Sequence, residues 1–218
     1  MPEPDEPIRY SPKVFDVETV EDARSIILQA ETPDRVARRW EIETPWFGGV
    51  IRQALALGPD SRVLDFGCGL GRLSKWLIDN VGCRAVGVDI SPSMREMAVE
   101  YVGSPRFSVA SYEAFRADPG LGEAFDGAFA CYVLQHVERP DQDLPAIAAG
   151  LRPGGRFFLA NSQTRWVPTT HGWAQDHFDV MAIAESCLLG AGTFVFPPEI
   201  AVLPGLDVET MLRVYRRP

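Results

Sequence analysis

The sequence predicts an α/β protein with a doubly wound, mostly parallel, seven-stranded sheet, helices on both faces and an N-terminal helical cap. From Ser61 to about Ala160, short apolar runs alternate with helical patterns. Alternation of this kind implies right-handed crossovers and parallel strands that are covered on both faces. The length of 218 residues and a hydrophobic content of 46% suit one globular domain with a full core.

Helices separated by prolines are expected before residue 60. They run from Thr19 to Ala30, from Thr32-Pro33 onward, and from Thr44-Pro45 to Gly58-Pro59. Residues 1–12 are acidic and Pro-rich, so we expect a loose tail or a strap there. We assign residues 1–45 to a tail and helical cap or lid, and residues 46–218 to the main domain.

Five parallel strands are expected after these helices, over 62–66, 84–89, 106–109, 126–131 and 155–160. The turn Arg152-Pro153-Gly154-Gly155 precedes the last of them. Between them, one helix ends near Gly82 and another, capped by Ser91, ends at Gly103. After Asn161 we expect a loop over 161–175, a helix over 176–189, and strands over 193–196, 200–203 and 211–215 that complete the sheet.

Composition excludes several classes of protein. The net charge of −9 argues against the commonest nucleic-acid binders, which need a positive surface. No apolar run approaches the roughly 18–20 residues that span a bilayer. The chain begins MPEPDEP, without a basic-then-apolar leader, and its four cysteines include no CxxC pair. We therefore expect a cytoplasmic protein with reduced thiols and with no membrane or nucleic-acid partner.

The most informative segment is a glycine-rich turn where the first parallel strand meets its helix. It reads Asp65-Phe66-Gly67-Cys68-Gly69-Leu70-Gly71, and Asp89 ends the neighbouring strand. Glycines let the backbone turn tightly and approach a ligand, and the second carboxylate can accept hydrogen bonds from both hydroxyls of a ribose. A tight turn with no ligand is the alternative for the glycines alone.

The ligand predicted for this turn is a nucleoside with an amino-acid-like tail. A dinucleotide is disfavoured because Arg72 stands where that fingerprint requires glycine. Asp65 at the loop entrance would also repel a pyrophosphate, whereas it suits a cationic group.

These residues resemble the class I, Rossmann-like, S-adenosylmethionine-dependent methyltransferases, over roughly residues 45–160. The resemblance implies S-adenosyl-L-methionine as cofactor and S-adenosyl-L-homocysteine as product. It implies that the methionine half is lined by Asp65, Gly67, Cys68, Gly69 and Gly71, that Asp89 holds the ribose, and that Ile90 and Met94 lie against the adenine. The run from Phe125 to Cys131, followed by Tyr132-Val133-Leu134-Gln135-His136-Val137, matches the element under the transferred methyl, so Cys131 is also a cofactor candidate.

One part of the pattern departs from the family. Its members often carry an acidic residue after the third strand, which contacts the adenine amino group. Here that region reads Ala110-Ser111-Tyr112-Glu113. Ser111 and Tyr112 are our candidates there, with Glu113 or a backbone carbonyl as alternatives.

Histidines are the candidates for a general base, which is needed only if the acceptor enters protonated. His136 follows the fourth strand, and His171 and His177 lie in the aromatic region after the fifth. The alternatives are a loop-orienting histidine for His136 and surface positions for the other two. Trp40 could cover the cofactor or simply pack its helix on the sheet.

We expect a small-molecule acceptor, bound by elements within residues 161–200, because this region is rich in aromatic side chains. Arg38 and Arg39 could neutralise the cofactor carboxylate, although a solvated helix face is the favoured interpretation. A metal-independent, in-line transfer to an O, N or C nucleophile is expected, by a monomer or a homodimer. The alternatives are a protein or peptide methyltransferase, and a non-catalytic nucleoside-binding module of this fold.

Overall fold

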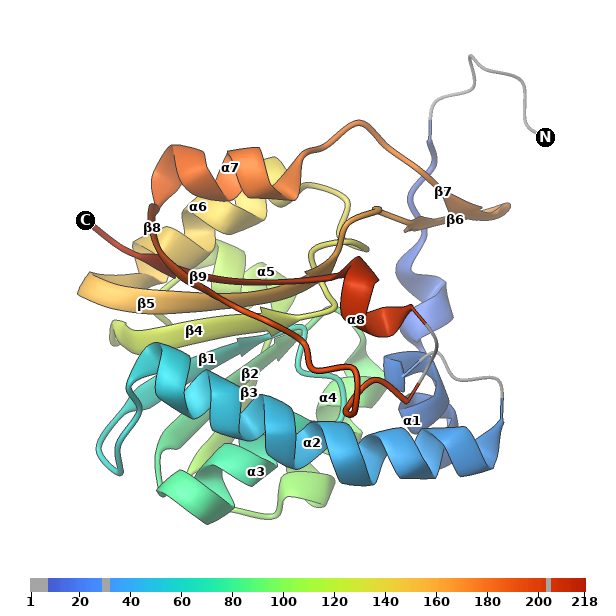
Figure 1. Ribbon diagram of the computed structural model, residues 1–218, viewed down its shortest axis with the longest axis horizontal. Coiled ribbons are helices and arrows are strands. Elements are labelled where there is room, and N and C mark those ends of the chain that lie inside the picture. Colours follow the sequence, from blue (N-terminus) through green and yellow to red (C-terminus); the bar gives the residue numbers. More distant parts are fainter. Residues whose placement is uncertain (1–7, 29–31, 203–204) are drawn as a thin grey trace.

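The computed structural model describes residues 8–28, 32–202 and 205–218. One large sheet lies between two layers of helices, with an N-terminal segment across one edge (Figure 1). The first half contains η1 (Pro12–Phe15), α1 (Val20–Leu28), α2 (Pro33–Leu55), β1 (Arg62–Phe66), α3 (Arg72–Val81), β2 (Arg84–Asp89), α4 (Pro92–Val102), β3 (Phe107–Ser111) and α5 (Tyr112–Ala117). The second half contains β4 (Phe125–Cys131), α6 (Pro140–Gly150), β5 (Leu151–Ser162), β6 (Val167–Thr169), β7 (Gly172–Ala174), α7 (Val180–Cys187), β8 (Leu189–Phe194), α8 (Leu206–Glu209) and β9 (Thr210–Arg216).

The large sheet has seven strands in the order β3-β2-β1-β4-β5-β9-β8. The first five are mutually parallel, whereas β9 is antiparallel to both β5 and β8. The strand order reverses beside β1, because β2 and β3 lie on one side of it and β4 and β5 on the other. The predicted doubly wound, seven-stranded α/β fold is confirmed, and the carboxyl ends of β1, β2 and β4 meet at one edge.

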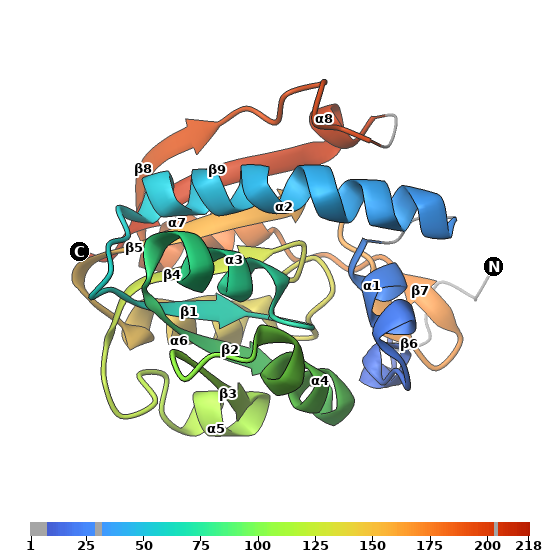
Figure 2. The ribbon, with the colours of Figure 1, turned by 90° about the horizontal axis from the view of Figure 1, so that it is seen from below.

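Helices cover both faces of this sheet, as Figure 2 shows from below. Side chains alternate along each strand, so Phe129 and Phe158 join the core under α2 and α3, while Phe157 and Leu159 join the core under α5, α6 and α7. Both faces of the central strands are therefore buried, as expected for parallel strands.

The two helices predicted on either side of Thr44 form one continuous helix, α2. Thr32 caps it as predicted, since its hydroxyl oxygen accepts a hydrogen bond from the Arg35 N–H. Thr44 does not cap a new helix, because its hydroxyl donates to the Trp40 carbonyl one turn earlier. Pro45 lies inside α2. The helix continues because its apolar stripe, including Phe47 and Ile51, is buried against the sheet.

The other differences between the predicted and the observed elements lie in the C-terminal third of the chain. Residues 161–175, predicted as a loop, include the β6–β7 hairpin. The predicted strand over 193–196 is shifted, because β8 begins at Leu189 directly after α7. No strand forms over residues 200–202, and Leu203 lies outside the described residues. Here the apolar side chains of Ile200 and Ala201 pack against the α2 side of the core without pairing to a strand.

The described part of the N-terminal segment lies across the carboxyl edge of the sheet. Tyr10 bridges to Thr169, and the Ser11 N–H donates to the Pro168 carbonyl at 2.9 Å, which attaches the segment to the β6–β7 hairpin. At its other end, the Val17 N–H donates to Ser93 Oγ at the start of α4. Residues 8–17 thus form a strap, which is one of the two alternatives expected for residues 1–12, of which residues 1–7 lie outside the described part. The predicted division at residues 45 and 46 falls inside α2.

Candidate functional site

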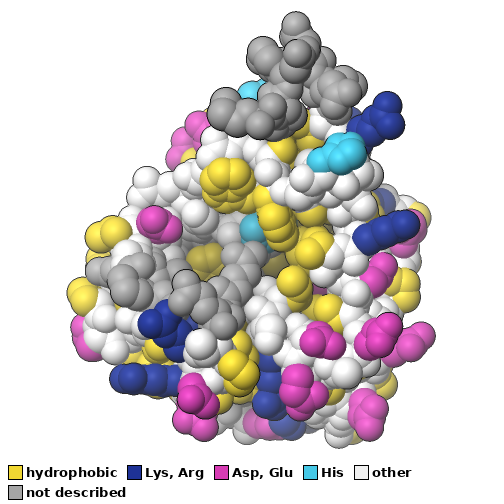
Figure 3. Space-filling model, turned by 90° about the vertical axis from the view of Figure 1, so that its right-hand side faces the viewer, with side chains coloured by type: hydrophobic (Ala, Val, Ile, Leu, Met, Phe, Trp, Pro, Cys, Tyr) yellow, Lys and Arg dark blue, Asp and Glu magenta, His cyan; other side chains and the backbone are white. Residues whose placement is uncertain are grey.

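A cavity of about 790 Å³ lies at the carboxyl edge of the sheet. Figure 3 looks onto this side of the molecule and shows a hollow with hydrophobic side chains inside it and along part of its rim. The glycine turn after β1, the ends of β2 and β4, and the strap with α1 supply its walls. This is the position at which open α/β sheets bind their ligands.

The glycine turn has backbone angles that favour glycine. Gly67, Gly69 and Gly71 all have positive φ, at 76°, 51° and 72°. A Cβ added to Gly67 would lie 2.4 Å from both methyl carbons of Val133, and one added to Gly69 would lie 2.8 Å from Cδ1 of Ile27. Val133 and Ile27 occupy the space that a side chain would take, so both positions require glycine, and Gly67 and Gly69 line the cavity with backbone atoms.

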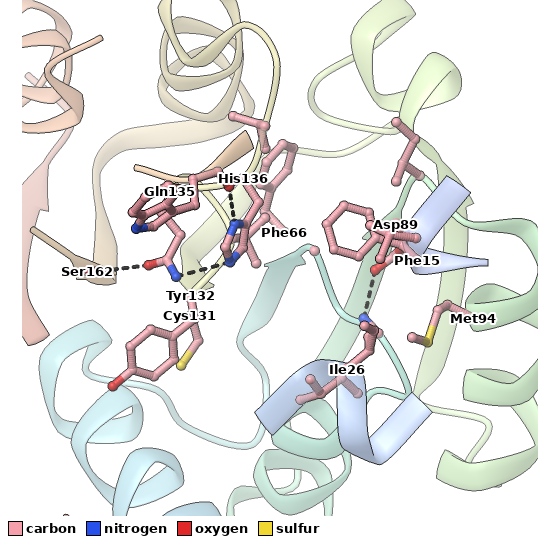
Figure 4. A pocket seen from close by; sticks show the side chains of 18 of the residues that line it. Phe15, Ile26, Phe66, Asp89, Met94, Cys131, Tyr132, Gln135, His136 and Ser162 are labelled. Carbon is pink, nitrogen blue, oxygen red and sulfur yellow. Dashed lines mark hydrogen bonds between the residues drawn. The ribbon is translucent and has the colours of Figure 1, made fainter. Parts of the chain in front are cut away.

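Asp89 lies beside this turn, at the end of β2. One carboxylate oxygen accepts a hydrogen bond from the Gly69 N–H at 2.8 Å (Figure 4), and the other accepts from the Ser91 N–H at 3.0 Å. Burial raises the pKa of Asp89 from its usual value. Each oxygen keeps a further lone pair, so the carboxylate can still accept hydrogen bonds from two adjacent hydroxyls.

The structure brings seven of the predicted cofactor residues to the cavity and leaves five outside its lining. Those that line it are Gly67, Gly69, Asp89, Ile90, Met94, Tyr112 and Cys131. Asp65 lies beneath the turn, where the Ser74 hydroxyl donates to it at 2.7 Å and burial raises its pKa to about 7. Gly71 is the residue that caps α3. Cys68 is buried against β2, since a Cβ on Gly87 would lie 2.6 Å from its Sγ.

Ser111 and Trp40 also have other contacts. The Ser111 hydroxyl accepts from the Ala114 N–H and caps α5, which the sequence could have indicated. Trp40 packs edge-on against Tyr101, with their ring centroids 6.0 Å apart, and lies beside two guanidinium groups. Trp40 therefore has packing contacts with α4, and it is not among the residues that line the cavity.

Arg39 is a site residue for which the sequence favoured a solvated position. It is buried, it lines the cavity, and its guanidinium pairs with buried Glu43 at 2.6 and 3.0 Å. It also donates to the Leu28 carbonyl at the end of α1. The spacing of four residues along an otherwise apolar helix face is the sequence signal for this pair. Arg38 is exposed, as expected.

His136 is the one predicted base that reaches the cavity. Its Nδ1 lies 2.6 Å from the Trp166 carbonyl oxygen, and its Nε2 lies 3.0 Å from the Gln135 amide nitrogen (Figure 4). The Gln135 carbonyl oxygen in turn accepts from the Ser162 N–H at 2.6 Å. These contacts assign a neutral imidazole with the proton on Nδ1, and burial lowers the pKa of His136.

The other two histidines lie outside this cavity. His171 is exposed in the turn of the β6–β7 hairpin, where its backbone N–H donates to Thr169 Oγ1. His177 is exposed and stacks on Phe178, beside a separate cavity of about 170 Å³. Both therefore occupy the surface positions that were their alternatives.

Tyr132 is a cavity residue that the sequence did not single out as a candidate. It directly follows β4 and has a φ of 57°, which is uncommon for a residue other than glycine. Its hydroxyl shares a hydrogen bond of 2.7 Å with Thr210 Oγ1, at the start of β9. Trp166, Trp173 and Ser162 line the same end of the cavity. No sequence pattern brings residue 132 next to residue 210, so this part of the site depends on the sheet order.

The strap and α1 cover the cavity. Val14, Phe15, Ile26 and Leu28 line it from this side. The Phe15 ring lies 6.3 Å from the His136 ring and 6.2 Å from the Trp173 ring, measured between centroids. The cover therefore contacts the His136 end of the cavity as well as the Asp89 end.

The residues present fit S-adenosylmethionine. The turn presents backbone to the cavity at Gly67 and Gly69, Asp89 keeps lone pairs for a ribose, and Arg39, paired with Glu43, brings guanidinium N–H groups to the wall. No group of three or more metal-ligating side chains occurs among the described residues. In the same part of the chain, no helix is long and apolar enough to cross a membrane.

Comparisons with known proteins agree with this geometry. Residues 38–186 match a family described as a methyltransferase domain. Methyltransferase GfsG of Streptomyces halstedii is 31% identical over 119 residues, which are 53% of this chain and 42% of that protein. The ubiquinone biosynthesis O-methyltransferase of Xanthomonas campestris pv. campestris strain B100 is 34% identical over 107 residues, 47% of this chain and 43% of that protein. The matched part of the chain thus spans less than half of these two relatives.

A solved structure extends the likeness to the whole fold. N-methyltransferase NodS from Bradyrhizobium japonicum WM9, in complex with S-adenosyl-L-homocysteine, superposes with a TM-score of 0.67. The match covers 92% of this chain and all of that one, at 18% sequence identity. Since the family match extends from α2 into α7, the chain belongs to the methyltransferase-domain family, the class I S-adenosylmethionine-dependent methyltransferases.

Proposed function

We propose that this protein transfers a methyl group from S-adenosylmethionine to a small-molecule acceptor, without a metal ion. The observation that carries the proposal is one continuous cavity, which extends from Asp89 and the glycine turn to Tyr132 and His136 under the strap. A covered cavity of this size suits a cofactor together with a small acceptor, whereas a polymer would need an open groove. The printed name of the Xanthomonas relative, an O-methyltransferase of ubiquinone biosynthesis, supports the same class of acceptor.

Different residues along the cavity would bind different parts of the cofactor. Asp89 would hold the ribose, the glycine turn would lie against the methionine half, and Arg39, whose charge is already paired with Glu43, would donate to the carboxylate of that tail through its remaining N–H groups. When bound, S-adenosylmethionine supplies a sulfonium methyl that is already activated. The protein's remaining tasks are to align the nucleophile and to exclude water. Phe15 and Trp173 give the other end an apolar wall, which favours dispersal of the sulfonium charge.

His136 is the proposed base for an acceptor that enters as a hydroxyl or phenol. Its Nδ1–H is held by the Trp166 carbonyl, so the ring is oriented and the basic lone pair is on Nε2. In the structure this lone pair faces the Gln135 amide. An acceptor hydroxyl that takes the place of the Gln135 N–H would donate to Nε2 and give up its proton there during transfer. The lowered pKa keeps His136 neutral, and therefore competent as a base, at neutral pH.

The proposal is tested with purified protein and methyl-labelled S-adenosylmethionine. Label transferred to members of a panel of phenols, hydroxy acids and amines, and not to RNA or protein, is the expected result. Label found only in RNA or protein would contradict it. Label transferred to nothing, by protein that binds the cofactor, would favour the non-catalytic module.

The role of His136 is tested by His136→Gln, with the exposed His177→Gln as the matched control. With a hydroxyl acceptor, we expect kcat to fall about 10²- to 10⁴-fold in the first variant and to stay unchanged in the second. The low-pH limb of the kcat profile should also disappear in His136→Gln. Equal kcat values for the two variants would rule out His136 as the base.

A further inference from the structure

Part of the cavity rim is formed by large apolar side chains that stay partly exposed. Val14, Trp166 and Trp173 all line the cavity, and they are 37%, 44% and 41% exposed. Figure 3 shows hydrophobic side chains along part of the rim of the hollow. Exposed apolar side chains that gather at the mouth of a binding cavity mark a surface that a ligand covers. These three side chains form an apolar rim.

The apolar rim is held directly beside the proposed base. The Trp166 N–H donates to the Gln135 carbonyl at 3.0 Å, and the Trp166 carbonyl accepts from His136 Nδ1. The Trp173 ring lies 5.1 Å from the His136 ring, measured between centroids. Val14 is on the strap, which is hydrogen-bonded to the β6–β7 hairpin that contains Trp173. An acceptor whose hydroxyl reaches His136 would therefore bring its ring substituents close to the rim.

The cavity offers no unpaired cation to an anionic acceptor. Arg39 is the one Lys or Arg among the described residues that line it, and its charge is paired with Glu43. Arg165, which precedes Trp166, is buried and pairs with Asp176 at 2.6 and 2.7 Å. The sequence outside the described residues contains no Lys or Arg. A carboxylate or phosphate on the acceptor would therefore lose water without gaining a counter-ion.

The charged side chains nearest to the base along the wall are negative. Glu138 lies two residues after His136, and Glu209 directly precedes Thr210, the partner of Tyr132. Both glutamates line the cavity and are exposed. They would repel an anionic group at this end, whereas an uncharged apolar group there loses no such interaction and covers the rim.

We infer that the acceptor is an uncharged aromatic hydroxyl compound, and that an apolar substituent on its ring leaves the cavity over Val14, Trp166 and Trp173. The inference rests on the proposed methyl transfer to a small molecule and names the class of that molecule. The acceptor ring would lie against the aromatic wall with its hydroxyl at His136. Its substituent would cover the exposed faces of the rim.

The test measures how tightly 4-alkylphenols bind to the protein saturated with S-adenosylhomocysteine, by calorimetry at neutral pH. The probes are 4-methylphenol, 4-propylphenol and 4-pentylphenol. Each methylene that covers the rim should lower the dissociation constant about three- to fourfold. The anionic probe is 4-(4-hydroxyphenyl)butanoate, which has a carboxylate at the end of a chain of similar length. It should bind at least about tenfold more weakly than 4-pentylphenol.

Substitutions in the rim show where the alkyl chain lies. Trp166→Ala and Trp173→Ala each remove one ring, so both should lower the gain in affinity per methylene, and the double variant should reduce it to about twofold or less. The matched control is Leu189→Ala on β8, because Leu189 is 48% exposed and does not line the cavity. This control should keep the wild-type gain. Thermal melts and the affinity for S-adenosylhomocysteine show that each variant is folded, and the single variants decide the outcome if the double variant does not fold.

The outcomes separate the inference from the proposed function. The inference would be overturned by an affinity that does not depend on chain length, by an unchanged gain in the tryptophan variants, or by a carboxylate probe that binds as tightly as 4-pentylphenol. A complex with S-adenosylhomocysteine that binds none of the phenols would also overturn it. Each of these results leaves the proposed function standing. Wild-type protein that does not bind S-adenosylhomocysteine would overturn the proposed function, and the inference with it.

Discussion

The substitution Asp89→Ala tests the central assignment of the site, that this carboxylate holds the ribose. Asp89 offers about four lone-pair directions, of which the Gly69 and Ser91 N–H groups use two. The remaining two, one on each oxygen, match the two adjacent hydroxyls of a ribose. Alanine would remove both of these acceptors and would also release the glycine turn from the end of β2.

The expected loss of binding free energy depends on which hydrogen bonds replace those to Asp89. Both ribose hydroxyls would bond to water instead, so only the net advantage of a charged acceptor is lost. That advantage amounts to about 1.5–3 kcal/mol. At 1.4 kcal/mol for each tenfold change, the dissociation constant of S-adenosylhomocysteine should rise about 10- to 150-fold.

Calorimetric titration of S-adenosylhomocysteine measures this change. The matched control is Glu96→Ala, which removes the same charge from an exposed position on α4 and should leave the dissociation constant unchanged. Thermal melts of both variants without ligand show that each is folded. Affinities for Asp89→Ala and Glu96→Ala that agree within twofold would refute the assignment of the ribose to Asp89.

Two further predictions concern the glycine turn and the carboxylate beneath it. Gly67→Ala should destabilise the protein by about 1–2 kcal/mol because of its left-handed backbone, and by a further amount because the new Cβ contacts Val133. The control is Gly122→Ala, which has a similar φ of 86° and nothing within 4 Å of the new Cβ. Equal losses of stability for the two variants in urea unfolding would show that the contact with Val133 costs nothing. Asp65→Asn should stabilise the ligand-free protein increasingly from pH 5 to pH 8. The raised pKa of about 7 means that the stability associated with protonated Asp65 is fully present below pH 4 and is lost as the pH rises through 7, whereas asparagine does not titrate. A pH-independent difference between Asp65→Asn and wild type would contradict the raised pKa.

Local sequence patterns were sufficient for the central part of the fold. The strands β1, β2 and β4 and the ends of α3 and α4 lie where apolar runs, Ser91 and the glycines at 82 and 103 predict them. Patterns of this kind act over a few residues, and here the tertiary structure agrees with them. The glycine turn and Asp89 could be predicted for the same reason, because adjacent parallel strands end at the same edge.

Long-range packing decided the elements for which local signals were misleading. Pro45 reads as a first-turn proline, yet burial of one apolar face carries α2 through it. Residues 189–192 contain two glycines and an expected helix stop, and they form β8 because β9 offers a strand to pair with. Isolated propensities have no information about such a partner.

The sequence by itself determined the fold class, the family and the part of the site that is formed by consecutive residues, because motif spacing and strand order place Gly67, Gly69 and Asp89 together. The tertiary structure alone decided which distant side chains complete the cavity. It buried Arg39 against Glu43, placed Tyr132 against Thr210 and aimed Tyr112 at Asp143. The physical reason is that burial and hydrogen-bond pairing between residues far apart in the chain depend on how the helices and strands pack, which no local spacing records.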